Sequence, residues 1–325
     1  MHSSLRTRAI VEGALMAALT AILALAGFYL PFLRFLTNLV WTIPIVIATV
    51  RHGLGIGIMS TVVAGFLIFT LASPLEALFL VLQFGGLALL YGYAFNKGIK
   101  PGITLLAGTG VAIISFLLTF GVSLLISGLN QINFVDQLKE TIEPTIEMYR
   151  SLGLFDKYGT SGLTEENMRQ MLAGFIDLLI VLFPALIVTY GIMAAFLNYI
   201  IAQKILFKLG IPVPQLPPFR NWQLPWWTVW GFIGGFGLSL AGSYWQIKTL
   251  TTIGSNIMMV YYPVLFVLGL SVIAYFYHHK LQRAFSYRLL FIFLVFFFFR
   301  YVSLLIPIVG LFDLVLNYRR LAGES

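Results

Sequence analysis

Long apolar segments place the strongest constraint on what this chain can fold into. A helix needs about 20 predominantly apolar residues to cross the roughly 30 Å hydrocarbon core of a bilayer. The sequence predicts eight spans and a ninth apolar segment, at 9–30, 35–50, 54–72, 75–95, 103–127, 172–202, 226–245, 256–277 and 287–317. Because these runs are continuous and not alternating, we expect an all-α polytopic membrane protein with eight, nine or more membrane segments.

The basic residues predict the orientation. Arg6 and Arg8 precede the first span, which lacks a signal-peptide cleavage site, so we expect this span to remain in the protein. With the N-terminus inside, the predicted inner segments hold most lysines and arginines, and the short outer turns hold only Arg34 and Lys248. This positive-inside bias accounts for the formal net charge of +8 as a topology signal, so nucleic acid is not an expected partner.

The last apolar segment, 287–317, leaves two topologies open. It is long enough for one tilted span or for a hairpin of two half-helices. Arg319 and Arg320 favour an inside C-terminus and hence the hairpin, but an odd ninth crossing stays open. The Arg300 side chain either reaches the membrane–water interface with its guanidinium group or pairs with Asp313.

Residues 128–171 form one long hydrophilic segment on the predicted outer side, with seven of the chain's twelve acids. Apolar residues at steps of three and four predict a helix with one apolar face there: Val135, Leu138, Ile142, Ile146, Tyr149 and Leu152. The segment is either a lid over an outward-facing pocket or a solvated connector. Thr164, followed by two glutamates, is expected to cap the sixth span.

A proline-rich stretch divides the chain. Residues 208–225 contain five prolines, which prevent a continuous helix. We therefore expect a six-helix membrane domain at 1–205, a cytoplasmic linker at 206–225 and a C-terminal helical membrane block at 226–325.

Small residues gather on the first span. Close approach of helices in lipid depends on such residues, because lipid provides little hydrophobic drive for helix pairing. The face consists of Gly13, Ala14, Ala17, Ala18 and Ala21. It serves either packing within this protein or docking of a partner.

A few polar side chains lie within or beside the predicted spans. Ionisable groups at membrane depth are costly unless they face a cavity or a partner, so Glu76 and Asp177 are candidate ligand-binding residues. Further candidates are Asn38, Trp41, Gln83, Thr119 and Ser123. Glu76 is alternatively a helix-start acid, and the hydroxyl groups alternatively bond within their own helix. Two acids in one pocket would favour a cationic ligand.

Several chemistries have no support in the sequence. It contains no cysteine and no phosphate-binding G-x-x-x-x-G-K-[ST] loop. His2, His52, His278 and His279 lie at or beyond the predicted inner face, with no acid or serine arranged around them in the sequence. We therefore expect no metal site, no cofactor and no enzymatic activity.

The first 205 residues resemble the substrate-binding S components of energy-coupling factor (ECF) vitamin transporters. The resemblance lies in the Arg-led first helix with Ala14 and Ala18, in VRHGLGIGIMS before the third span and in SPLEALFLVLQFGGLALLYGYAFNKG at the fourth. Over the whole chain, including the closing IVGLFDLVLNYRR, the sequence is similar to the YybS-like family of uncharacterised bacterial membrane proteins.

The resemblance implies a location and a mechanism. S components are multi-pass proteins of the bacterial cytoplasmic membrane whose pocket opens outward, lined by the fourth to sixth helices and the outer loops. Their alanine motif docks on a transmembrane coupling subunit, and ATPases act in trans. By this resemblance Ala14 and Ala18 are docking residues.

The sequence thus favours a subunit that captures a small solute, vitamin-like or cationic, and docks on a coupling subunit in the lipid bilayer. The alternative is a non-transport membrane scaffold in the bacterial envelope. An intramembrane enzyme has the least support.

Overall fold

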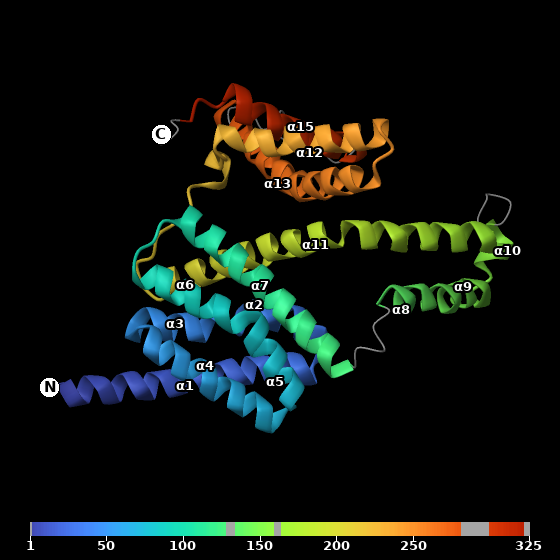
Figure 1. The fold of residues 1–325 in the computed structure, drawn as a ribbon. Coiled ribbons are helices and arrows are strands. Elements are labelled where there is room, and N and C mark those ends of the chain that lie inside the picture. Colours follow the sequence, from blue (N-terminus) through green and yellow to red (C-terminus); the bar gives the residue numbers. More distant parts are fainter. Residues whose placement is uncertain (1, 128–133, 159–163, 281–298, 322–325) are drawn as a thin grey trace. The chain divides into compact units, whose positions relative to one another are not determined.

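The computed structural model describes residues 2–127, 134–158, 164–280 and 299–321, and within these ranges it contains helices and no strand (Figure 1). Among the described residues, six helices are long and apolar enough to cross a membrane: Thr7–Tyr29, Leu54–Leu71, Pro74–Asn96, Pro101–Ile126, Glu165–Lys208 and Lys248–His279. This finding confirms the predicted all-α polytopic membrane protein.

The chain forms two compact units. The first consists of Met1–Ser127 and Ile187–Leu216, and the second of Gly128–Leu186 and Pro217–Ser325. The long helix α11 (Glu165–Lys208) contributes its first part to the second unit and the remainder to the first. The division after Leu216 falls inside the predicted linker, whereas the outer segment groups with the C-terminal block.

The predicted span at 35–50 is interrupted. It forms α2 (Arg34–Val40) and α3 (Ile43–His52), and α3 has only 10 residues, about 15 Å of helix. Every residue from Ile43 to Thr49 is buried, so α3 is an internal element of the first unit. Pro44 lies in the first turn of α3, and Gly53 ends the helix at a φ of 84°, a conformation that favours glycine.

The predicted span at 226–245 and the last apolar segment also differ in extent. α12 (Val229–Tyr244) has 16 residues, fewer than a perpendicular crossing needs. Of the segment 287–317, the structure describes α15 (Phe299–Leu316), and the remainder lies outside the described residues. The choice between one span and a hairpin therefore stays a prediction.

Four helices surround α3 in the first unit: α1 (His2–Tyr29), α4 (Leu54–Leu71), α6 (Gly86–Asn96) and the second part of α11. The core is aromatic as well as aliphatic. The rings of Tyr91 and Tyr199 meet edge to face at 5.7 Å, and the Tyr91 hydroxyl donates to the Ala195 carbonyl at 2.6 Å. The linker belongs to this core, since Tyr199 and Gln203 both donate to the Pro214 carbonyl.

Residues 134–158 of the predicted outer segment form three short helices that pack on the first part of α11 within the second unit; we call them, by their predicted side, the outer hairpin. Its helices are α8 (Phe134–Glu140), α9 (Ile142–Ser151) and α10 (Leu154–Tyr158). The predicted apolar face is confirmed in part: Ile142 and Ile146 are buried against Ile176 of α11, while Leu152 is exposed. The predicted cap is also confirmed, because the Thr164 hydroxyl accepts from the Asn167 amide at 3.2 Å.

Glycines allow the C-terminal helices to approach closely. α12, α13 (Lys248–Lys280) and α15 lie side by side (Figure 1). A Cβ added at Gly254 would meet the backbone of α12, and one added at Gly310 would meet the backbone of α13. The glycines thus provide the close backbone contact on which helix packing in lipid depends.

A side-chain amide is inserted into the backbone of α11. Pro184 lies within this helix and has no N–H group to donate. Asn256 of α13 accepts from the Ala185 amide at 2.9 Å and donates to the Val181 carbonyl at 2.8 Å. It therefore occupies the position of the regular hydrogen bond between Ala185 and Val181, next to the proline, and gives both of these groups a partner.

Candidate functional site

The clearest polar contact inside the first unit joins Gln83 to Tyr190. The Gln83 amide donates to the Tyr190 hydroxyl of α11 at 2.6 Å. Gln83 lies in a five-residue π-helical segment, Val81–Gly85, between α5 (Pro74–Leu80) and α6. Such segments change the direction of side chains within a helix and are frequent at functional sites.

Aromatic rings pack on Tyr190 and on Phe84, the residue that follows Gln83. Trp41, between α2 and α3, packs edge to face on Phe84 of the π-helical segment at 6.0 Å. Phe116 of α7 (Pro101–Ser127) packs on the Tyr190 ring at 5.2 Å. We call these five residues, Trp41, Gln83, Phe84, Phe116 and Tyr190, the Gln83 cluster. Four parts of the chain that are distant in sequence contribute to it.

Three buried polar side chains in the described residues of the first unit are unsatisfied, those of Thr20, Trp41 and Thr189. Within the described part of the chain, the Trp41 Nε1–H and the Thr189 hydroxyl have no hydrogen-bond partner. Trp41 is 1% exposed, and Thr189 directly precedes Tyr190. A buried polar group without a partner costs about 1–3 kcal/mol, so both groups would gain from a ligand that offers hydrogen bonds.

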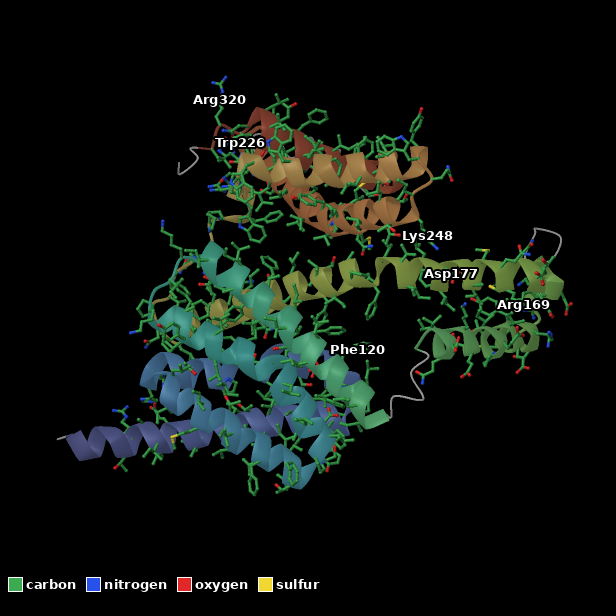
Figure 2. All side chains as sticks on the ribbon, in the orientation of Figure 1. Phe120, Arg169, Asp177, Trp226, Lys248 and Arg320 are labelled. Carbon is green, nitrogen blue, oxygen red and sulfur yellow. The ribbon has the colours of Figure 1, made fainter. Side chains whose placement is uncertain are left out.

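The two predicted acids belong to different units. Glu76 pairs with Arg34 at 3.0 Å, and its backbone amide donates to Ser73, as in a helix-start acid. Asp177 is exposed on the part of α11 that belongs to the second unit (Figure 2). Arg34 already balances the charge of Glu76, which removes the electrostatic reason for expecting a cationic ligand.

The remaining predicted ligand residues are scattered. Thr119 donates to the Ser115 carbonyl of its own helix at 2.8 Å, which matches the non-ligand alternative. Ser123 is half-buried further along α7, beyond Phe120 (Figure 2). Asn38 is half-buried on α2. Of the seven predicted residues, the structure brings only Trp41 and Gln83 into the Gln83 cluster.

The small-residue face of α1 separates into two groups. Gly13, Ala17 and Ala21 are buried within the first unit, where a Cβ added at Gly13 would meet Ile56 of α4. These three positions therefore serve packing inside the protein and are not accessible to a separate subunit. Ala14 is exposed and Ala18 is half-buried, so these two remain accessible.

One expectation about the histidines is wrong. The sequence showed no acid near His52, but the fold brings Glu12 of α1 into contact with its imidazole. The Glu12 carboxylate also lies 3.8 Å from Arg51 and 3.9 Å from Arg8. Helix packing, which sequence spacing does not show, creates this cluster. In the described ranges, no three His, Asp or Glu side chains could together hold a metal ion.

The sequence analysis also missed a buried arginine near the C-terminus. Arg319 is 3% exposed, and each of its five N–H groups has an acceptor. The acceptors are the Asp313 carboxylate, the Ser271 hydroxyl and the carbonyls of Arg220 and Trp222, at 2.7–3.0 Å. We call these five residues the Arg319 cage. Asp313 thus pairs with Arg319, while the Arg300 side chain lies outside the described residues.

Backbone conformation helps to bury this charge. Asn317 and Arg320, on either side of Arg319, have φ values of 43° and 46°, in the left-handed region that ordinary residues avoid. The turn directs Arg319 inward, and its contacts offset the cost of that strain. One signal in the sequence could have indicated this pair: Asp313 is the only aspartate of the last hundred residues, and it lies six positions before Arg319.

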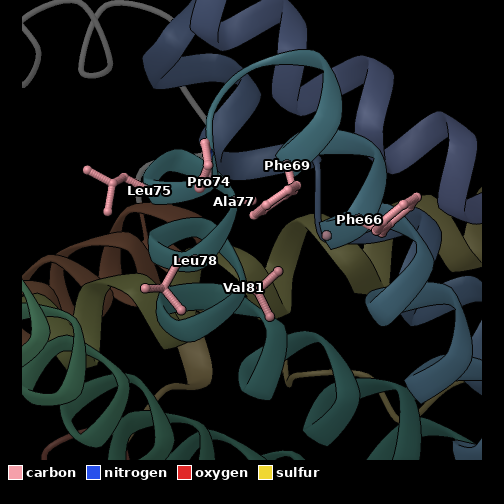
Figure 3. Close-up of a pocket in the computed structure, with 8 residues that line it drawn as sticks. Phe66, Phe69, Pro74, Leu75, Ala77, Leu78 and Val81 are labelled. Carbon is pink, nitrogen blue, oxygen red and sulfur yellow. The ribbon is translucent and has the colours of Figure 1, made fainter.

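An open apolar groove lies along α4 and α5, with a volume of about 550 Å³ (Figure 3). Its lining residues are Gly65, Phe66, Phe69, Pro74, Leu75, Ala77, Leu78 and Val81. None of them has a polar side chain that could orient a solute. The groove therefore does not compete with the Gln83 cluster as a site for a polar ligand.

Comparison with known proteins supports a membrane protein. A family model described as "Predicted membrane protein (DUF2232)" matches residues 18–314. The chain is 27% identical over 285 residues to the "Uncharacterized protein YybS" of Bacillus subtilis (strain 168), covering 85% of this chain and 86% of that protein. No solved structure matches it.

Proposed function

Because this chain belongs to the DUF2232 family of predicted membrane proteins, which assigns no activity, we propose from its own site that it is a membrane-embedded binding protein for a small uncharged solute. One observation carries the proposal: Gln83 of the π-helical segment donates to Tyr190, and in the described ranges two polar groups of neighbouring residues have no partner. These groups are the N–H of Trp41, whose ring packs on Phe84, and the hydroxyl of Thr189, which precedes Tyr190. These groups are neutral, so the proposed solute is an uncharged ring compound with hydrogen-bonding groups.

The proposal includes a partner, as the resemblance to S components implies. Ala14, exposed on α1, and Ala18, one turn further on, would meet a transmembrane coupling subunit whose ATPases drive uptake. The N-terminus and this end of α1 are cytoplasmic in the proposal, in agreement with the distribution of basic residues. Small side chains let the two backbones approach closely.

The outer hairpin enters the proposal as a lid. Its apolar face already packs on α11, and Arg150 and Arg169 tie it to Glu165 and Glu143 by ion pairs of 2.6 and 2.8 Å. Closure would therefore move α8 to α10 together with the first part of α11. A lid of this kind would exclude water from a solute bound in the first unit.

Affinity purification in mild detergent from the native host, followed by mass spectrometry, tests the proposal. Co-purification of an integral coupling subunit with a pair of ATPases, lost in Ala14→Leu, would support it. The matched control is Ala9→Leu, since residue 9 lies about 140° away around the same helix. Recovery of other envelope proteins alone would instead favour the scaffold alternative.

Solute binding is tested separately on the purified protein. Its thermal unfolding is measured in the presence of water-soluble vitamins and nucleobases. Each compound is added at about 100 times a micromolar Kd, at which a bound ligand raises the unfolding free energy by about 2.7 kcal/mol. A compound that raises the melting temperature of the wild type and not of Gln83→Leu supports the site. A compound that acts equally on both proteins would place binding elsewhere.

A further inference from the structure

A second cavity lies in the second unit, where the linker crosses the end of α13. Its volume is about 310 Å³, and it is lined by Pro218, Phe219, Arg220, Ala274, Tyr277 and His278. Three of these residues come from the linker and three from the last two turns of α13. The cavity is independent of the Gln83 cluster, since all its residues belong to the second unit.

The lining combines positive charge with apolar surface. Arg220 and the imidazole of His278 both face the cavity, and apolar side chains with one phenol form the remainder. In the described ranges, no Asp or Glu side chain forms an ion pair with Arg220. Of the residues that the structure does not describe, 281–298 contain no acid, and 322–325 contain one, Glu324. An anion is therefore the ligand that the charges favour.

The Arg319 cage holds the linker wall of the cavity in place. Arg319 donates to the carbonyls of Arg220 and Trp222, both at 2.7 Å, so the backbone of Arg220 is fixed while its side chain stays available. Trp222 further packs on Phe219 at 4.9 Å and donates to the Pro217 carbonyl at 2.8 Å. A buried network in which every Arg319 N–H group has an acceptor thus supports residues that themselves touch the cavity, as a prepared binding site requires.

The depth of the cavity identifies the occupant. Tyr277 and His278 end the candidate span Lys248–His279, where an apolar sequence changes to His278, His279 and Lys280. Phosphate groups of lipids lie at this level of a bilayer. A ligand with one phosphate and an apolar portion matches the lining better than inorganic phosphate, which would leave Phe219, Pro218 and Ala274 without contact.

We propose that this cavity binds the phosphate headgroup of an anionic membrane phospholipid, with Arg220 and His278 as donors to the phosphate oxygens. The positive-inside bias predicts that this lipid belongs to the inner leaflet. Basic pockets at that side of membrane helices are suited to anionic headgroups. The Arg319 cage acts as the positioning element, because it touches the linker backbone and not the lipid.

Lipid exchange followed by native mass spectrometry tests the proposal on the full-length protein. The delipidated protein is offered dioleoyl-phosphatidylglycerol and dioleoyl-phosphatidylcholine in equal amounts. We expect preferential retention of phosphatidylglycerol by the wild type, a loss of about fivefold in Arg220→Gln, and a smaller loss in His278→Gln. Arg220→Gln should fold, because only the backbone carbonyl of residue 220 takes part in the cage.

The matched control is Arg320→Gln, which removes the same charge from an exposed side chain, that of the last but one described residue. Equal retention by Arg220→Gln and Arg320→Gln would overturn the site, since the preference would then come from general surface charge. Inorganic phosphate is added in about 10-fold excess over the lipid. If it displaces phosphatidylglycerol, the lipid is overturned as occupant and the cavity is assigned to a soluble phosphate compound.

Discussion

The side chain of Asn256 stands between the Ala185 amide and the Val181 carbonyl, where a regular helix would join these two groups directly. One side chain from α13 therefore completes the backbone of α11. Pro184 makes this necessary, because its ring prevents a regular helix at the same point. Within the second unit, the long helix depends on its neighbour for its continuity.

Asn256→Ala should destabilise the protein by about 1–2 kcal/mol, because it leaves an amide and a carbonyl of α11 without partners at membrane depth. Chemical unfolding in detergent micelles measures the change. Adding Pro184→Ala should recover part of the loss, since the helix can then close its own hydrogen bonds. Ser255→Ala, one residue away, is the control, and an equal loss there would contradict the assigned role of the amide.

Gln83→Leu and Tyr190→Phe should each cost about 1 kcal/mol of unfolding free energy, because each leaves the other polar group of a 2.6 Å hydrogen bond without its partner. The double variant should cost less than the sum, which a double-mutant cycle measures. Thr119→Val is the control with a small effect, as Thr119 bonds within its own helix. Strict additivity would show that the two side chains are not coupled.

Arg319→Gln should cost about 3–5 kcal/mol, because it leaves the Asp313 carboxylate buried without its counter-charge. Asp313→Asn in the same chain should recover part of this loss by removing the uncompensated charge. Arg320→Gln should change stability by less than about 0.5 kcal/mol, since that side chain is exposed. Thermal unfolding compares all four proteins, and similar effects at positions 319 and 320 would refute the cage.

The attachment of the outer hairpin should depend on pH. The Arg169 side chain donates to Glu143 and lowers the pKa of this carboxyl below its ordinary value of 4.5. A carboxyl whose pKa is lower in the folded state stabilises the fold above pH 4.5, and this contribution is lost as the pH falls through the folded-state pKa.

Hydrogen exchange of the amides in residues 134–158, measured at pH 6 and pH 3.5, about one unit below the ordinary carboxyl pKa, checks the prediction. We expect faster opening at the lower pH, after correction for intrinsic exchange. Glu143→Gln should open easily at both values, whereas Glu140→Gln should behave like the wild type. An unchanged pH response in Glu143→Gln would assign the effect to other groups.

The sequence allowed prediction of what repeats along the chain. Apolar length predicted most spans, and the steps of three and four located the buried Ile142 and Ile146. Periodicity predicts that a helix has an apolar face, but it does not show which element packs against that face. The same limit applies to α1, where Gly13 and Ala17 pack inside the first unit although the spacing fitted an external partner equally well.

Contacts between distant residues were beyond prediction. Gln83 and Tyr190 are 107 positions apart, and Arg319 and the Arg220 carbonyl are 99 apart. No local rule relates such pairs, because tertiary packing alone brings them together. Arg319 is an example. The sequence analysis interpreted it as a topology signal because it is a basic residue near the C-terminus. Its burial could be predicted only if its acceptors on the linker and α13 were known.

The interleaved order of the two units has a consequence for synthesis at the ribosome. Asn198, which accepts from the buried Thr42, and Ala195, which accepts from Tyr91, are translated only after the whole outer hairpin. The first four long helices therefore enter the bilayer before their polar groups have acceptors. Until residue 216 leaves the ribosome, we expect this incomplete bundle to need a chaperone at the insertion site. A pause in translation before residue 216 would prolong the time for which its polar groups lack acceptors.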